Sequence, residues 1–149
     1  MTLEGAYEPS PSDWVSTQVA EYEASGGQRA NTLLDTGLPI VVVTTRGNKS
    51  GKIRKTPLMR VEHEGKYALV ASKGGAPEHP VWYYNLVADP GAVAIQDGPA
   101  PFAVAVRQVE GDERTTWWDR AVAAYPPYAE YQANTDRVIP VFVATPTGT

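Results

Sequence analysis

The most concentrated chemistry in the sequence is a run of basic side chains in the first half of the chain. Residues 46–60, here called the basic segment, carry no acid and six bases: Arg46, Lys49, Lys52, Arg54, Lys55 and Arg60. The whole protein has 13 bases, 17 acids and a formal net charge of −4, so this segment runs against the overall balance. Such a concentration of positive charge favours a site for a polyanionic ligand over a solvated turn, which would normally mix both signs.

Two further segments carry groups that could line a cleft beside the basic segment. Residues 71–75 (ASKGG) end an apolar run, and the two glycines let a ligand approach backbone N–H groups closely. Residues 82–85 (WYYN) place aromatic rings and an amide on a short helical stretch. A plain glycine turn and core packing of Trp82 are the ordinary alternatives. Together with the basic segment, these residues predict a cleft that suits a flat ring system with an anionic tail.

Three tyrosines near the C-terminus form the last cluster. Tyr125, Tyr128 and Tyr131 recur every three residues, so a helical turn after Pro126-Pro127 would place Tyr128 and Tyr131 on adjoining faces. Packing in the core of a C-terminal helix is the alternative. Because each buried hydroxyl needs a hydrogen-bond partner, three tyrosines are an unusual choice for a small core. We therefore predict an aromatic, hydrogen-bonding lid over a flat acceptor.

Several kinds of chemistry are excluded by residue types that the chain lacks. It has no cysteine, which excludes disulfides, thiolate metal sites and a cysteine nucleophile, and fits a reducing cytoplasm. Its two histidines, His63 and His79, are too few for a three-histidine centre, and we expect no metal. Residues 47–52 (GNKSGK) lack the spacing of a P-loop and its final Ser or Thr. An enzyme with so few acid–base groups would rely on a cofactor.

The rest of the chain predicts neither a nucleic-acid partner nor a membrane span. It offers no extended basic face for nucleic acid. No apolar run approaches the roughly 18 residues that a span needs, and Met1–Ser10 lacks the basic and apolar regions of a secretion signal. We therefore expect a cytoplasmic protein, with peripheral contact to a membrane surface left open.

Periodicity and turn residues predict mostly short strands with a few helices. The apolar run 39–45 (PIVVVTT) reads as a strand buried on both faces. A helix is expected from residue 12 to Gly26-Gly27, and others at 79–88, 111–124 and 128–134. The remaining strands are expected at 53–62, 66–72, 92–96, 102–109 and 138–144. Six strands in strand–strand succession favour a mostly antiparallel barrel with peripheral helices, an α+β class.

Several short segments also follow one another along the chain in a recognisable order. These are 44–54 (TTRGNKSGKIR), 57–58 (PL), 71–75 (ASKGG), 80–86 (PVWYYNL), 89–90 (DP), 125–132 (YPPYAEYQ) and 135–140 (TDRVIP). In this order they resemble the deazaflavin-dependent nitroreductase family of actinobacteria, from about residue 38 to 144. Members of that family are split β-barrels related to FMN-binding oxidoreductases. They use reduced coenzyme F420, a deazaflavin with a phospholactyl and oligoglutamyl tail, to reduce quinones and nitroimidazole prodrugs.

The resemblance implies roles for individual residues. Lys49 and Arg54 would bind the tail, the backbone of Val70–Ser72 would run along the ring, and Ser72 would lie near its reactive edge. The full set implied for cofactor binding is Lys49, Ser50, Gly51, Lys52, Arg54, Pro57, Val70, Ala71, Ser72, Lys73, Gly74, Gly75, Trp82 and Asn85. The acceptor side would comprise Met59, Tyr125, Tyr128 and Tyr131, with Ser72, Tyr128 or Tyr131 donating a hydrogen bond to the reduced acceptor.

Three departures from the family pattern bear on these expectations. Met59 stands where prodrug-activating members often have tyrosine, Asn48 replaces a common base, and the N-terminal segment is acidic rather than basic. We predict one domain, with an N-terminal helical segment (1–30) packed on a split barrel (31–149). Its function would be hydride transfer from reduced F420 to a quinone-like, enone or nitro acceptor. The alternatives are the same barrel with FMN and a non-enzymatic carrier of a cofactor or lipid.

Overall fold

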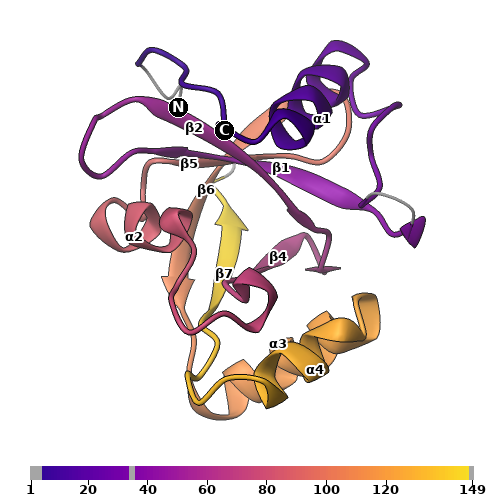
Figure 1. Cartoon of the computed structure of the whole chain (residues 1–149), viewed down its shortest axis with the longest axis vertical. Helices are drawn as coiled ribbons and strands as arrows, with labels where there is room; N and C mark the ends of the chain where they lie inside the picture. The colour runs from indigo at the N-terminus through magenta and orange to yellow at the C-terminus, as the bar shows by residue number, and fades with distance from the viewer. Residues whose placement is uncertain (1–4, 34–35, 148–149) are drawn as a thin grey trace.

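An antiparallel sheet that curls on itself dominates the computed structural model, which describes residues 5–33 and 36–147 (Figure 1). Its strands are β1 (Ile40–Arg46), β2 (Ile53–Met59), β3 (Glu62–His63), β4 (Lys66–Val70), β5 (Val93–Gln96), β6 (Pro101–Gln108) and β7 (Val141–Pro146). They lie in the order β2-β1-β5-β6-β7-β4-β3, and every neighbouring pair is antiparallel. The predicted antiparallel, split-barrel class is thus confirmed.

The two ends of this strand order belong to one continuous stretch of chain. β2 leads into β3 through Arg60 and Val61, and these two residues still make sheet-like bonds on opposite sides. The Arg60 N–H donates to the Pro39 carbonyl beside β1 at 3.0 Å, and the Ala68 N–H of β4 donates to the Val61 carbonyl at 2.9 Å. One bent segment therefore pairs with both ends of the sheet and curls it into a half-barrel.

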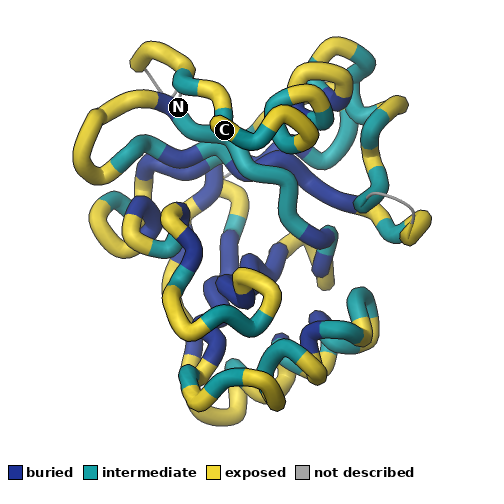
Figure 2. The backbone as a smooth tube through the Cα atoms, in the orientation of Figure 1, coloured by how far each residue is buried: buried dark blue, intermediate teal, exposed yellow. Residues whose placement is uncertain are grey.

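The core lies on both sides of β1. Val41 and Val43 pack into one buried cluster, whereas Ile40 and Val42 pack into another, because side chains alternate along a strand. All four side chains are almost fully buried. Figure 2 shows the same pattern, with burial concentrated on the strands and exposure on the outer turns of the helices. The β-branched run was correctly predicted to be buried on both faces.

In the described ranges, the helices and the 3₁₀ turn η2 lie around the curled sheet. They are α1 (Asp13–Ala24), η2 (Lys73–Gly75), α2 (Val81–Ala88), α3 (Gly111–Ala124) and α4 (Pro127–Ala133). α1 packs on β2, and α4 packs on both α3 and η2 (Figure 1). No helix within the described ranges is long and apolar enough to cross a membrane. The domain boundary at residue 30 stays a prediction, and residues 1–4 of the N-terminal unit lie outside the described residues, Glu4 among them.

Several predicted boundaries were wrong, for reasons that involve proline. α2 begins at Val81 rather than 79, because Pro80 holds an extended conformation and disfavours helical backbone at His79. β7 begins at Val141 rather than 138, because Pro140 has no N–H to donate to the sheet; its carbonyl accepts from Ala71 instead. The predicted extended stretch 53–62 is broken after Met59, and a separate strand, Glu62–His63, follows, so the sheet of the described residues has seven strands instead of six.

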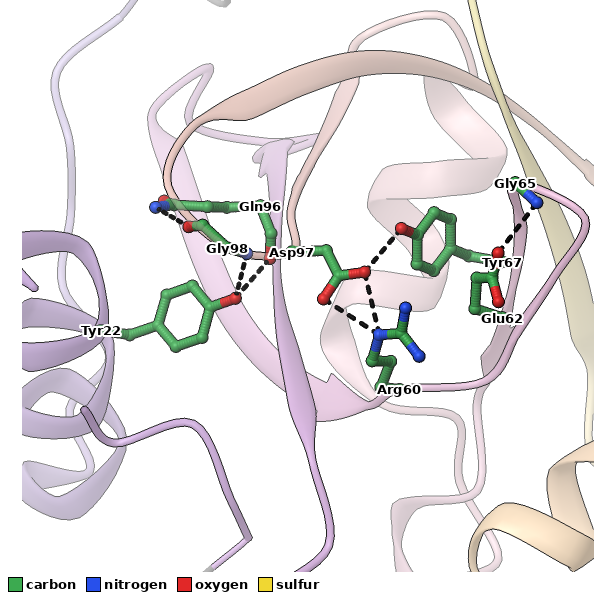
Figure 3. Close-up of polar contacts among 8 residues, drawn as sticks. All are labelled: Tyr22, Arg60, Glu62, Gly65, Tyr67, Gln96, Asp97 and Gly98. Atoms are coloured by element: carbon green, nitrogen blue, oxygen red, sulfur yellow. Dashed lines mark hydrogen bonds and ion pairs between the residues drawn. The ribbon is translucent and has the colours of Figure 1, made fainter. Parts of the chain in front are cut away.

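A hydrogen-bonded network closes one end of the barrel (Figure 3). The carboxylate of Asp97, just after β5, accepts from Arg60 Nε at 2.9 and 3.0 Å and from the Tyr67 hydroxyl at 2.7 Å. Next to it, the Tyr22 hydroxyl of α1 accepts from the Gly98 N–H at 2.8 Å. Burial, together with the bond to Asp97, raises the pKa of Tyr67 far above its usual value. The network ties α1, β4, the β2–β3 junction and the β5–β6 turn together.

We expect Asp97→Asn to lower the free energy of unfolding by about 1.5 kcal/mol, the low end for hydrogen bonds to a charged group. In a domain of this size, that change lowers the melting temperature by about 3–6 °C. Asp136→Asn is the matched control, because Asp136 is exposed and makes no side-chain bond to a described residue. Equal melting temperatures for both variants would show that the carboxylate charge does not stabilise the barrel.

Candidate functional site

Three adjoining cavities form a groove from the loop between β1 and β2 to the tyrosines of α4. The loop cavity, about 550 Å³, is lined by Glu8, Gly47, Asn48, Lys49, Ser50, Arg54, Val81, Tyr84 and Asn85. The bridge cavity, about 330 Å³, is lined by Ser10, Pro11, Val15, Arg54, Lys55, Thr56, Val81, Trp82 and Asn85. The ring cavity, about 450 Å³, is lined by Trp14, Leu33, Ile40, Pro57, Leu58, Met59, Val70, Ser72, Lys73, Gly74, Pro80, Trp82, Tyr125, Tyr128 and Tyr131.

Shared residues show that these cavities adjoin one another. Arg54, Val81 and Asn85 line both the loop and bridge cavities, and Trp82 lines both the bridge and ring cavities. The loop between β1 and β2, the segment from β4 to η2, and α2 are far apart in sequence, yet their residues line the same groove. The adjoining cavities have basic side chains at one end and tyrosines at the other, as in the predicted cleft, whose binding role stays a prediction.

At the loop end, a buried amide holds the backbone in place. Asn85 of α2 accepts a hydrogen bond from the Asn48 N–H at 3.0 Å and donates to the Thr45 hydroxyl at 3.2 Å. Lys49 and Ser50 are exposed beside this anchor and line the cavity with Arg54. Asn85 thus positions the loop as well as lining the groove, a role that only its partners reveal.

Most of the basic segment is paired with acids that the sequence places elsewhere. Arg46 pairs with Asp89 at 3.4 Å, Arg54 with Glu8 at 3.7 Å and Arg60 with Asp97 at 2.9 Å, and Lys55 pairs with Glu23. Within the described ranges, Lys49 and Lys52 have no such partner, and of these two only Lys49 lines the groove. Of the basic segment, Lys49 is therefore the unpaired charge of the groove among the described residues, and Arg54 adds a charge held only by a long contact to Glu8.

At the ring end, the turn after β4 has an unusual backbone. Ser72 is right-handed helical, whereas Lys73 and Gly74 have φ values of 47° and 64°. This sequence of conformations lets successive N–H groups converge on a partially negative atom. In the described part of the chain, the N–H groups of Lys73 and Gly74 have no backbone acceptor. Gly75 must be glycine, because an added Cβ would lie 2.7 Å from the Tyr131 carbonyl oxygen.

Arg137, to which the sequence analysis assigned no role, holds this turn from behind. Its guanidinium donates to the carbonyls of Ser72 at 2.7 Å, Ala71 at 2.9 Å and Ala76 at 3.1 Å. It also lies 3.0 Å from His79 Nδ1. Burial and the nearby Arg137 charge lower the pKa of His79, which favours the neutral ring as an acceptor. The sequence showed that Arg137 belongs to the TDRVIP segment, but it did not show which groups Arg137 bonds.

We expect Arg137→Lys to weaken binding of any ring ligand by about 1–2 kcal/mol, because one ammonium cannot replace three bonds from a planar fork. A cofactor and its tailless ring should lose the same affinity in a fluorescence titration, since the change loosens only the turn. Arg29→Lys is the control, at an exposed arginine outside the groove. A loss restricted to the tailed ligand would place the effect of Arg137 at the other end.

The three tyrosines take different positions around the ring cavity. The Tyr125 and Tyr131 hydroxyls bond each other at 2.9 Å, which with burial raises the pKa of Tyr125 to about 12. Tyr128 is 5% exposed and its ring packs in the core, as the packing alternative expected. Its hydroxyl nonetheless has no hydrogen-bond partner among the described residues, and Tyr128 lines the cavity. Burial raises the pKa of Tyr128, so the hydroxyl stays a donor.

Most of the predicted site residues line the groove. Those that do are Lys49, Ser50, Arg54, Pro57, Met59, Val70, Ser72, Lys73, Gly74, Trp82, Asn85, Tyr125, Tyr128 and Tyr131. Gly51, Lys52, Ala71 and Gly75 do not, although Ala71 and Gly75 shape the turn. Among the residues that the structure places, no group of three or more His, Asp or Glu side chains could hold a metal ion. The roles of these residues stay predictions.

Comparisons with known proteins agree on one family. A family model described as F420H(2)-dependent quinone reductase matches residues 14–146. An F420H(2)-dependent quinone reductase of Mycobacterium tuberculosis is 37% identical over 110 residues, which are 72% of this chain and 73% of that protein. A solved F420-H2 dependent reductase is 60% identical, covers 71% of this chain and 93% of its own, and has a TM-score of 0.67. A structure described as a domain-swapped dimer is 54% identical, covers 91% and 99%, and has a TM-score of 0.69.

Proposed function

Because the chain belongs to the F420H(2)-dependent quinone reductase family, we propose that its groove binds reduced coenzyme F420 along its length. The chain is an oxidoreductase that uses this cofactor to reduce a quinone. The ring would lie in the ring cavity and the phospholactyl and glutamyl tail at the loop cavity. The observation that supports this placement is the row of adjoining cavities from Lys49 and Arg54 to the tyrosines.

The residues of the groove fit both parts of such a molecule. The ring cavity is bordered by apolar side chains of Met59, Val70 and Trp82 and by the turn at Ser72–Gly74. N–H groups of that turn suit the carbonyl edge of a flat heterocycle. At the loop cavity, Arg54 can fork onto a phosphate or carboxylate, while Lys49 adds a point charge.

The bound cofactor supplies a hydride from its ring carbon, and the protein supplies position and electrostatics. Trp82, the Ser72 turn and Tyr128 all line the ring cavity, so an acceptor placed beside the ring there would lie next to Tyr128. As a quinone accepts hydride, negative charge develops on its oxygen. The unpartnered Tyr128 hydroxyl can donate to that oxygen, and the paired Tyr125 and Tyr131 hydroxyls border the same space. Ser72 is a second donor at the ring edge. Enone and nitro compounds develop similar charge and are proposed as further acceptors.

The test is a side-by-side fluorescence titration with F420, FMN and FAD, followed by turnover with a soluble quinone. We expect the tightest binding for F420. Its tail combines a phosphate with several carboxylates, which can engage more of the loop-cavity donors than the phosphate groups of FMN or FAD alone. Oxidation of reduced F420 should depend on both the protein and the quinone. Tighter binding of FMN would favour the flavin alternative, and binding without turnover would favour the carrier.

A further inference from the structure

The N-terminal strap, residues 5–12, lies along the edge of β2 and leads into α1 (Figure 1). Tyr7 pairs in parallel with Ile53. Two backbone bonds hold it there: the Glu8 N–H donates to the Ile53 carbonyl at 2.9 Å, and the Ile53 N–H donates to the Ala6 carbonyl at 2.8 Å. These backbone bonds therefore set the position of Glu8 relative to β2. Glu8 is bonded to Ile53, the residue next to Arg54 in the chain.

This placement brings a carboxylate into the loop cavity. Glu8 lines that cavity with Lys49, Ser50 and Arg54, and it is the one acid among the described residues that do so. Its Oε2 lies 3.7 Å from Arg54 Nη1. An acid here is unexpected if the cavity only has to attract an anionic tail, because the Glu8 carboxylate would repel the negative groups of that tail.

The Glu8–Arg54 pair is weak enough to be exchanged. The Arg54 and Glu8 side chains are 29% and 43% exposed, and their contact is a single long one rather than a two-bond fork. Exposed pairs of this kind change an equilibrium only a few-fold. A phosphate offers Arg54 shorter bonds in a matching geometry, so it can displace the carboxylate.

We propose that Glu8 is a specificity-determining residue, which competes with the anionic tail for Arg54 and weakens tail binding in the wild-type protein. This inference rests on the proposed placement of the tail in the loop cavity. The oxidised cofactor must leave after each hydride transfer, and a built-in competitor for Arg54 lowers the cost of that exchange. Among the described residues, Glu8 lines the loop cavity and not the ring cavity, so we expect its effect only on ligands that carry the tail.

The experiment compares wild-type protein with Glu8→Gln, Glu8→Lys and Glu21→Gln in titrations with F420 and with the same deazaflavin ring lacking its tail. Glu21 is an exposed acid on α1 outside the groove, so Glu21→Gln matches the charge change. We expect Glu8→Gln to bind F420 about three- to fivefold more tightly, the range of an exposed ion pair, and Glu8→Lys to bind it tighter still. Binding of the tailless ring and of Glu21→Gln should match wild type.

The gain should shrink as salt rises, because the Debye length falls to about 3 Å at 1 M. If Glu8→Gln binds F420 with wild-type or lower affinity, Glu8 does not compete with the tail. An equal gain for the tailless ring would also overturn the proposal, because the effect would then lie outside the loop cavity. Failure of the wild-type protein to bind F420 would instead refute the placement of the cofactor, which is a separate result.

Discussion

The double variant Lys49→Ala/Arg54→Ala is expected to bind F420 at least about 100-fold more weakly than the wild-type protein. Each side chain contributes about 1.5–3 kcal/mol if it bonds a charged group of the tail, and about 1.4 kcal/mol is a factor of ten. Both line the loop cavity, and Lys49 has no competing ion pair within the part of the chain that the structure describes. Affinity of the tailless ring should stay near the wild-type value, since the ring cavity is unchanged.

Arg29→Ala/Lys66→Ala is the matched control, because it removes two positive charges at exposed positions outside the groove. Fluorescence titrations at low and high salt measure the affinities. Wild-type affinity should fall with salt, whereas that of the double variant should change little. Unchanged F420 affinity in the double variant, with no response to salt in either protein, would show that this part of the basic segment is only a solvated turn.

Tyr128→Phe is expected to lower turnover with a quinone about 100-fold, the low end for the loss of one oxyanion donor. Tyr128 lines the ring cavity and its hydroxyl has no hydrogen-bond partner among the described residues, so its removal breaks no bond to a described residue. Melting temperature and cofactor affinity should therefore stay near wild type. Because burial raises the pKa of Tyr128, the hydroxyl remains protonated through mildly alkaline pH, and turnover of the wild-type protein should not fall there through loss of this proton.

The three measurements should be made on the same preparations of wild type, Tyr128→Phe, Tyr131→Phe and Tyr83→Phe. Tyr83 stacks on His79 and packs on Phe142, outside the cavities of the groove, so it controls for loss of an unrelated hydroxyl. Tyr131→Phe removes the partner of Tyr125 and should lower turnover less than Tyr128→Phe. A lower melting temperature with unchanged turnover per folded molecule would assign the tyrosines to packing and move the acceptor site towards Met59.

Local features of the fold could be predicted from the sequence alone. The run 39–45 is β-branched and apolar, and it forms a strand buried on both faces. The predicted helix 111–124 has the bounds of α3, because an acidic first turn opens it and prolines follow it. The glycines of 71–75 likewise permitted the tight turn at η2. These signals lie within a few neighbouring residues, so the sequence alone is enough to predict them.

Boundaries beside proline were less predictable, because two local preferences compete there. At residues 79–80, the spacing of apolar residues favours a helix, whereas the backbone restriction before Pro80 favours an extended conformation. The contacts of His79 with Arg137 and Tyr83 stabilise the extended choice. The contact with Arg137 joins two distant parts of the chain, and spacing alone does not reveal it.

The sequence by itself determined the family, the half-barrel class and the groups that could meet a ring with an anionic tail. Only the tertiary structure decided which of those groups are available. Arg54 and Lys55 pair with Glu8 and Glu23, so much of the charge asymmetry along the chain is cancelled in space. Likewise, Arg137 holds the Ser72 turn through carbonyl groups that have no sequence signature. Charge and hydrogen bonding act between atoms a few ångströms apart, and the closing of the sheet, not distance along the chain, sets which atoms are that close.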